Sequence, residues 1–259
     1  MTHENCKIYK HFYKFYIRFS NLFMIENKIG EYQTRLMDKF PDSSFTVRRE
    51  LIFADIRPEF KFEEIKPQET KGGRRIWKFK SNDKYELNIL TNALDITSKK
   101  HKSYRGNNNN EGFRDLIKYT VDHFLELIPI KTFKRIGLRY IDYSPIPALD
   151  SETFTKWYNT AFRLDRFNLD QVGSMFFEAQ NVNRGKYAFT YRERFAPEKI
   201  EGLEESEKQY ILDFDGYAGN IPSEKYLDVL DDLRDLIHHE WENTIKQPVK
   251  DWMDKDRED

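Results

Sequence analysis

Two arginines on one predicted strand are the side chains of this sequence that we expect to bind a ligand. The segment KRIGLRYID, residues 134–142, alternates apolar and polar residues, as a strand with one buried face does. Arg135 and Arg139 then share one face with Gly137 between them, where the missing side chain leaves room for a close neighbour. A guanidinium binds carboxylate and phosphate groups through paired hydrogen bonds, so this face is a candidate binding site.

The same pattern also permits a structural role for the two arginines. If another element covers their face of the sheet, we expect them to pair with acids such as Asp142 or Glu178. The other face of this strand is expected to be core, and it consists of Ile136, Leu138 and Tyr140.

A basic segment, residues 71–105, is a candidate nucleic-acid interface. It holds ten lysines and arginines against three acidic residues, and it interleaves cations with aromatic rings, as proteins that bind single-stranded nucleic acid do. In IWKFK, however, the aromatics Trp77 and Phe79 alternate with Lys78 and Lys80, which indicates that the aromatics are core and the lysines face solvent. The cations that we expect to bind are Arg74, Arg75, Lys99 and Lys100.

The last long helix of the chain offers two further candidate sites. Arg234 and His239 have the arginine-x4-histidine spacing of helical ribonucleases from prokaryotic defence, although residues five apart on a helix point about 140° from each other. The alternative is an arginine whose stem covers the core and a solvated histidine. Four residues form a stripe that is either a metal site or an acidic solvated face, and they are Asp231, Asp235, His238 and Glu242.

No set of residues indicates a particular reaction. Asp213 and Asp215 share one face of a predicted strand and could bind Mg²⁺ or act as acid and base, but Asp-Gly also ends strands. The chain has no phosphate-binding glycine loop, nucleophile elbow or zinc-protease helix. Its single cysteine, Cys6, excludes an internal disulfide and a thiolate-built zinc site. We therefore predict a non-enzymatic protein without catalytic residues, bound metal or cofactor.

The elements that position these residues follow from periodicity and turn signals. Strands are expected at about 8–19, 45–56, 74–81, 84–98, 134–142, 174–182, 186–195 and 208–219, and helices at about 25–40, 113–129, 151–164 and 223–244. Ser151 is the expected N-cap of the third helix. The second helix should bury Phe113, Ile117, Val121, Phe124 and Ile128, and the fourth should bury Leu230, Leu233, Ile237, Trp241 and Ile245.

The order of elements indicates a duplicated α+β domain. Both halves follow the order strand, helix, three or four strands, helix, and Tyr85 and Tyr210 begin matching strands 125 residues apart. We predict a single domain, residues 1–259, of antiparallel sheets with four main helices and two pseudo-repeats at about 7–130 and 131–250. Two sheets and one continuous sheet are both compatible with the pattern.

Four segments resemble a sporadically distributed family of uncharacterised prokaryotic proteins of about this length. The segments are RRIWKFKSNDKYELNILTNALDITS, RIGLRYID, LDFDGY and HHEWENTIKQPVKDWM, and their order runs over nearly the whole chain. The chain departs from the pattern in having Asp142 where asparagine is common. The resemblance implies no catalytic set, and the patchy distribution implies genes in mobile or defence-related neighbourhoods.

Charge and composition suggest a cytoplasmic protein with a partner. No apolar run is long enough to span a bilayer, and lysines interrupt the N-terminal segment, so we expect no membrane association. Residues 198–259 hold 19 acidic and 8 basic residues; since the net charge is −1, residues 1–197 carry +10. Such asymmetry favours an acidic partner for the basic part.

Three functional hypotheses follow. The first is a protein-interaction or regulatory accessory component of a prokaryotic antiviral defence or mobile-element system, whose protein partner is encoded by a neighbouring gene. The second is nucleic-acid binding through residues 71–105. The third is a ribonuclease that uses Arg234 and His239.

Overall fold

The structure, a computed structural model, describes residues 10–48, 51–52, 68–69, 74–107, 110–199 and 206–255. The strands are β1 (Lys10–Arg18), β2 (Asp42–Arg48), β3 (Leu51–Ile52), β4 (Gln68–Glu69), β5 (Arg74–Lys80), β6 (Tyr85–Leu90), β7 (Ala93–Ser98), β8 (Thr132–Ser144), β9 (Met175–Arg184), β10 (Tyr187–Lys199) and β11 (Ser206–Pro222). Nine of them form one continuous antiparallel sheet in the order β2-β5-β6-β7-β1-β8-β11-β10-β9, and β3 pairs with β4 alone. The predicted α+β class is confirmed, with one main sheet rather than two.

The described residues contain five α-helices, one more than the four expected. They are α1 (Met24–Leu36), α2 (Phe113–Leu127), α3 (Ser151–Trp157), α4 (Tyr226–Thr244) and α5 (Gln247–Lys255), and a single 3-10 turn, η3 (Ser223–Lys225), precedes α4. The fifth helix, α5, was not predicted. None of the described helices combines the length and apolar character needed to cross a membrane.

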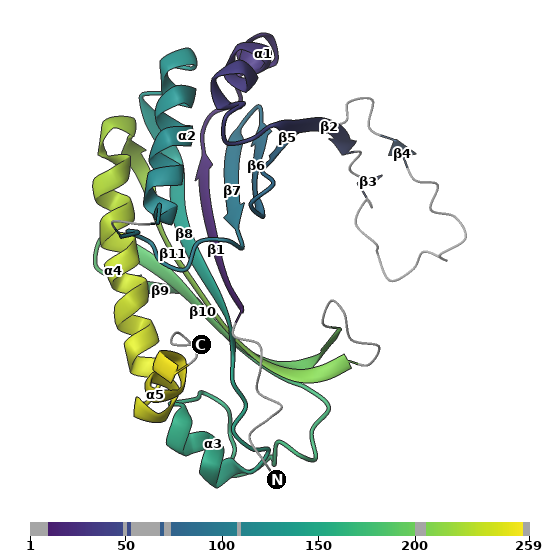
Figure 1. Cartoon of the computed structure of the whole chain (residues 1–259), viewed down its shortest axis with the longest axis vertical. Coiled ribbons are helices and arrows are strands. Elements are labelled where there is room, and N and C mark those ends of the chain that lie inside the picture. The colour runs from purple at the N-terminus through teal and green to yellow at the C-terminus, as the bar shows by residue number, and fades with distance from the viewer. Residues whose placement is uncertain are drawn as a thin grey trace.

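Helices α1, α2 and α4 lie along one face of the sheet (Figure 1). The ring of Phe113 in α2 stacks on that of Tyr13 in β1, at 5.2 Å between centroids. At Gly216 of β11 a Cβ would lie 3.4 Å from Leu233 of α4, so this helix packs directly on the strand. Among the described residues no helix covers the opposite face, which we call the open face (Figure 1).

The predicted apolar stripes do form the core. All five predicted residues of the α2 stripe are buried, and in the α4 stripe only Trp241 is partly buried. Alternation also assigns the strands correctly: Tyr85, Leu87 and Ile89 of β6 are buried while the residues between them are half-exposed. The apolar core between the sheet and the helices is therefore built by every second residue of the strands and by every third or fourth residue of the helices.

Two predicted elements differ from the structure, and a third lies partly outside the described residues. Residues 84–98, expected as one strand, form the hairpin β6–β7, because the chain reverses at Thr91-Asn92 and Leu90 pairs with Ala93. Helix α3 ends at Trp157 instead of continuing to 164, and Asp150 rather than Ser151 caps it by accepting a 2.7 Å hydrogen bond from the Thr153 backbone. Most of the predicted strand 45–56 beyond β2 lies outside the described residues.

Candidate functional site

The open face at the centre of the sheet is built by alternate residues of β1, β8 and β11. The core face of β8 is as predicted, since Ile136, Leu138 and Tyr140 are buried beneath the helices. Arg135, Gly137 and Arg139 therefore lie on the open face. Their cross-strand partners on β1 are, in order, Arg18, Tyr16 and Lys14, and those on β11 are Gly219, Tyr217 and Asp215.

Gly137 is the contact point of this face, and its close neighbour is Tyr16. A Cβ added to Gly137 would overlap the Cζ, the hydroxyl and the Cε1 of the Tyr16 ring, far inside the 3.0 Å below which something must shift. The glycine is needed because an aromatic ring from the adjacent strand occupies the place of its side chain. The space predicted beside the two arginines is thus filled from within the protein.

Arg139 begins a chain of ion pairs that crosses four strands. Its Nε and Nη2 donate to the two carboxylate oxygens of Asp213, at 2.7 and 2.6 Å. Asp213 also accepts from Nη1 of Arg192 at 3.3 Å, and Nε of Arg192 donates to Glu178 at 2.5 Å. Charge-assisted pairs of this geometry hold each guanidinium in a fixed orientation.

The carboxylate partners differ from those expected for the two arginines. Asp142 lies on the helix-covered side of β8, where it is 1% exposed and contacts Nδ1 of His11. Its position follows from alternation, since residue 142 shares a face with 136, 138 and 140. Glu178 does lie on the open face, but it binds Arg192 rather than Arg135 or Arg139.

Arg135 is held by aromatic rings instead of a carboxylate. Its guanidinium carbon lies 3.7 Å from the centroid of Tyr217 and 5.4 Å from that of Tyr16, distances typical of cation–π contacts. The Tyr217 hydroxyl in turn donates to the side chain of Asn181. Asn181 sits in a β-bulge opposite Thr190, with a positive φ of 53°, which directs its side chain to the open face.

Asp215 is a buried carboxylate at the centre of this face. Burial raises the pKa of Asp215 above its ordinary value, although a 3.1 Å hydrogen bond from Tyr16 and the nearby Arg139 and Arg135 oppose the rise. Burial and Asp215 together also raise the pKa of Tyr16, so this hydroxyl keeps its proton. The prediction that Asp213 and Asp215 share one face of the strand is correct.

Arg18 and Asp95 extend the network toward β7. Nη1 of Arg18 donates to Asp95 at 2.5 Å. Nine residues linked in this way across β7, β1, β8, β11, β10 and β9 form what we call the open-face network, and they are Tyr16, Arg18, Asp95, Arg135, Arg139, Glu178, Arg192, Asp213 and Asp215. The network consists of guanidinium groups, carboxylates and one tyrosine, an arrangement suited to the recognition of charged groups.

The basic segment is divided between the two faces and the edge of the sheet. Arg75 lies on the helix-covered side, where it donates to Glu26 of α1 at 3.1 Å. Lys100 binds Asp83 at 2.5 Å, whereas Nζ of Lys99 lies 5.3 Å from the Phe12 ring, next to the open face. The side chain of Arg74 lies outside the described residues. Trp77 and Phe79 do pack against the core, as predicted.

The candidate residues of α4 are engaged in other contacts. Arg234 donates to Asp235 at 2.9 Å and His239 lies 3.2 Å from Asn243, so no described contact joins Arg234 with His239. In the predicted metal stripe, Asp231 accepts two hydrogen bonds from Arg114, at 2.8 and 2.9 Å. Within the described part of the chain no group of three or more potential ligands is placed to hold a metal ion. Cys6 lies outside the described residues.

One buried acid was not predicted. Glu193 is fully buried on the helix-covered side of β10, and its carboxylate accepts four hydrogen bonds. The donors are the hydroxyl groups of Thr160, Tyr191 and Tyr210 and the backbone N–H of Ala161. Because two donors come from the segment after α3, Glu193 fixes that segment to the sheet.

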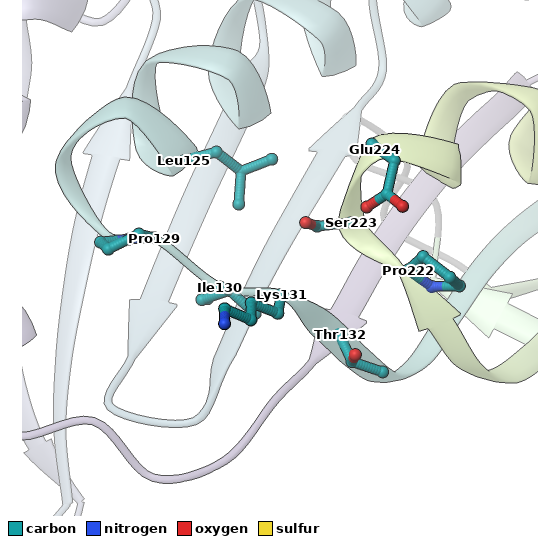
Figure 2. Close-up of a pocket in the computed structure, with 8 residues that line it drawn as sticks. All are labelled: Leu125, Pro129, Ile130, Lys131, Thr132, Pro222, Ser223 and Glu224. Carbon is teal, nitrogen blue, oxygen red and sulfur yellow. The ribbon is translucent and has the colours of Figure 1, made fainter.

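A pocket of about 510 Å³ lies away from all the predicted sites, between the end of α2 and the start of η3 (Figure 2). Its floor is closed by a 2.9 Å hydrogen bond from the Ser223 backbone to Lys131. The lining residues are Leu125, Pro129, Ile130, Lys131, Thr132, Pro222, Ser223 and Glu224.

The sequence of β1 contains a signal for part of the open-face network. Lys14, Tyr16 and Arg18 alternate with buried Phe15 and Ile17, so one polar face could be assigned from the sequence. The sequence could not show that this face lies beside Arg135 and Asp215, because that arrangement depends on the register between strands. Neither protein-family models, nor curated proteins, nor solved structures show a match to this chain.

Proposed function

We propose that the protein is a non-enzymatic interaction module that binds a protein partner through the open face of its sheet. The observation that carries the proposal is the open-face network, an array of oriented arginines and carboxylates on a face that no described helix covers. Oriented charges on a rigid sheet recognise a complementary surface without rearranging, which favours specific binding.

The charge of this face supports an acidic partner surface. Arg18, Arg139 and Arg192 each have a carboxylate partner, whereas Lys14 and Arg135 have none among the described residues. Together with Lys14, the network holds five cations against four carboxylates, so the centre of the face carries a small excess of positive charge. Positive surfaces attract negative partners and speed their association.

In the cell, we propose that the protein is an accessory, regulatory or neutralising component of a prokaryotic antiviral defence or mobile-element system. The support is the resemblance of its four segments to a patchily distributed prokaryotic family and the absence of a catalytic set from the open-face network. The partner would be encoded by a neighbouring gene.

The test is capture of that gene product by the tagged protein from its native lysate. We expect the wild type to retain the neighbour's product in a stoichiometric complex and the double variant Lys14→Glu, Arg18→Glu to lose it. The control is Arg163→Glu, which reverses an exposed arginine that pairs only with Asp165. A wild type that stays monomeric and unpartnered, or a complex that survives the double variant, would contradict the proposal.

Nucleic-acid binding is the second candidate, and one observation favours it. Lys14 and Lys99 border an aromatic pair on the open face, in which the rings of Phe12 and Tyr143 lie 5.5 Å apart. Cations beside exposed rings suit single-stranded nucleic acid. The carboxylates interleaved through the open-face network weigh against it, because a polyanion that crosses the face would meet them.

Filter binding across a salt series tests this candidate. If it holds, retention of an oligonucleotide falls steeply with salt and is lost in a Lys14→Glu, Lys99→Glu variant. The matched variant Arg75→Glu, Lys100→Glu should retain the oligonucleotide, since those cations are turned to Glu26 and Asp83. Equal retention by the two variants would rule the candidate out.

We also propose that residues 7–130 and 131–250 are structural repeats. The support is the strand order: outward from the central pair, one side follows β1, β7, β6, β5 and the other follows β8, β11, β10, β9. A deep alignment of homologous sequences that shows no similarity between the halves would count against a common origin.

A further inference from the structure

One arginine of the open-face network, Arg135, differs from the others in having no carboxylate partner among the described residues. Arg18, Arg139 and Arg192 each have a guanidinium nitrogen 2.5 to 2.6 Å from a carboxylate oxygen, of Asp95, Asp213 and Glu178 respectively. Its Nε is buried and makes no hydrogen bond. A buried donor without an acceptor is costly, so the described residues leave the hydrogen-bonding capacity of Arg135 partly unused, and a ligand acceptor has to bind those of its N–H groups that solvent reaches.

Two tyrosines hold Arg135 in place for such an acceptor. Tyr217 lies against the guanidinium, 3.7 Å from its carbon to the ring centroid, and Tyr16 flanks it at 5.4 Å. Both rings are themselves tied down, Tyr16 by its hydrogen bond to Asp215 and Tyr217 by its hydrogen bond to Asn181. Because the arginine is oriented in advance, little side-chain entropy is lost when a ligand binds.

A second arginine stands directly beside the first. Arg18 and Arg135 are opposite each other on β1 and β8, and like charges in that position destabilise a sheet. The next residues along the row are small, Ala93 beside Arg18 and Gly219 beside Arg135. The pair of guanidinium groups is thus bordered by low side chains, and of the two only Arg18 has a carboxylate partner among the described residues, Asp95.

We propose that Arg135 and Arg18 together bind a carboxylate of an acidic segment of the protein partner. This inference rests on the proposed function and specifies the chemistry of the partner's contact. One carboxylate placed between the two guanidinium groups neutralises their repulsion and accepts charge-assisted hydrogen bonds from both. The tyrosines at the sides exclude water, which strengthens the pairing.

A carboxylate on a protein fits the surroundings better than a nucleic-acid backbone. Beyond the arginine pair, the neighbouring rows of the face contain Asp95, Asp213, Asp215 and Glu178. A chain with one negative charge per nucleotide would be repelled at those rows, whereas an acidic side chain with neutral or basic neighbours meets only the arginines.

The experiment is titration of the purified full chain with a fluorescein-labelled peptide that carries one glutamate among serine and glycine residues, followed by fluorescence anisotropy. We expect saturable binding by the wild type and a loss of affinity of about tenfold or more in Arg135→Met, since a hydrogen bond to a charged group is removed. The control Arg163→Met makes the same charge change at an exposed site and should bind as the wild type does. Circular dichroism checks that Arg135→Met is folded, and Arg135→Lys, which keeps the charge but loses the planar fork, should fall between the two.

The outcomes separate this inference from the proposed function. Equal binding by the wild type and Arg135→Met, or binding of labelled oligothymidylate but not of the single-glutamate peptide, overturns the carboxylate subsite. If the peptide fails in this way while the neighbour's gene product is still captured through the open face, the interaction function stands without this subsite. If both experiments fail, both proposals fall.

Discussion

The ring of Tyr16 occupies the space that a side chain at position 137 would need, so Gly137 and Tyr16 are one packing unit on neighbouring strands. This relationship explains why a glycine interrupts a strand of large residues. It also places the Tyr16 hydroxyl on Asp215 and the Tyr16 ring beside Arg135. Disturbing either residue should therefore affect the centre of the open-face network.

Gly137→Ala should lower the free energy of unfolding by about 1–3 kcal/mol, the usual cost of overpacking. In a Tyr16→Ala background the same substitution should cost much less, because the ring that it meets is gone. Urea denaturation of the four proteins of this cycle measures the coupling. Gly30→Ala is the control: nothing lies within 4 Å of a Cβ there, so alanine inside α1 should stabilise by about 0.5–1 kcal/mol. Additive costs would show that Tyr16 does not constrain Gly137.

Asp215→Asn should raise stability at neutral pH. The pKa of Asp215 is raised by burial, so the folded state disfavours its charged form, and the wild type loses stability as pH rises through that pKa. Asparagine removes the charge, and its side-chain oxygen can still accept the hydrogen bond from the Tyr16 hydroxyl. The gain should vanish in acid, where Asp215 is protonated in the wild type.

Thermal denaturation between pH 3 and pH 8 checks this expectation. Asp213→Asn is the contrasting variant, and it should destabilise at neutral pH, because Asp213 accepts two short hydrogen bonds from Arg139 and a third from Arg192. A loss of stability in Asp215→Asn at neutral pH would mean that the ionised carboxylate is favoured there.

Arg114→Met should cost about 1–2 kcal/mol at neutral pH, because it removes two charge-assisted hydrogen bonds that join α2 to α4. Partial burial acts to raise the pKa of Asp231, but hydrogen bonds from Arg114 and Tyr104 outweigh it and lower that pKa. A lowered pKa contributes stability above the ordinary pKa of aspartate, and this contribution is lost as pH falls through the lowered value. The difference between wild type and variant should therefore shrink in acid.

Urea denaturation at several pH values measures this effect. Lys118→Met provides the control, since it removes an exposed pair with Asp122 on the same helix and should cost about 0.3–0.5 kcal/mol. Equal costs for the two variants would contradict a special role for the α2–α4 pair.

Glu193→Gln should destabilise the protein by about 1–3 kcal/mol, since two of four donors lose their acceptor in a buried site when one carboxylate oxygen becomes an NH2 group. The Ala161 backbone N–H cannot become an acceptor, so it keeps its bond only if the amide oxygen faces it, and two hydroxyl groups must then turn to accept from the NH2 group. Hydrogen exchange should accelerate at residues 159–164. Glu152→Gln, on an exposed side chain, should leave both measurements almost unchanged, and unaltered exchange in Glu193→Gln would refute the anchoring role.

Alternation along each strand was enough to assign its faces, including the buried Ile136, Leu138 and Tyr140 and the open-face Arg135 and Arg139. The same rule places Asp142 on the core side of β8, opposite the face of the arginines, so the expectation that Asp142 pairs with them was wrong and alternation alone could have excluded it. The partner of Arg139 was not predictable, because Asp213 is 74 residues away and strand register brings the two together. Glu193 was missed for a similar reason, since two of its donors, Thr160 and Ala161, come from a segment that lacks regular structure, and a third, Tyr210, comes from the neighbouring strand.

The parts of the open-face network lie far apart along the chain, and this has a consequence for synthesis. Tyr16 and Asp215 are separated by 199 residues, and contacts of such long range form late in folding. A nascent chain on the ribosome holds Tyr16 and Arg135 long before Asp213 and Asp215 emerge. We therefore expect the charged face to become competent only in the finished protein, so that a partner made at the same time meets no half-formed receptor.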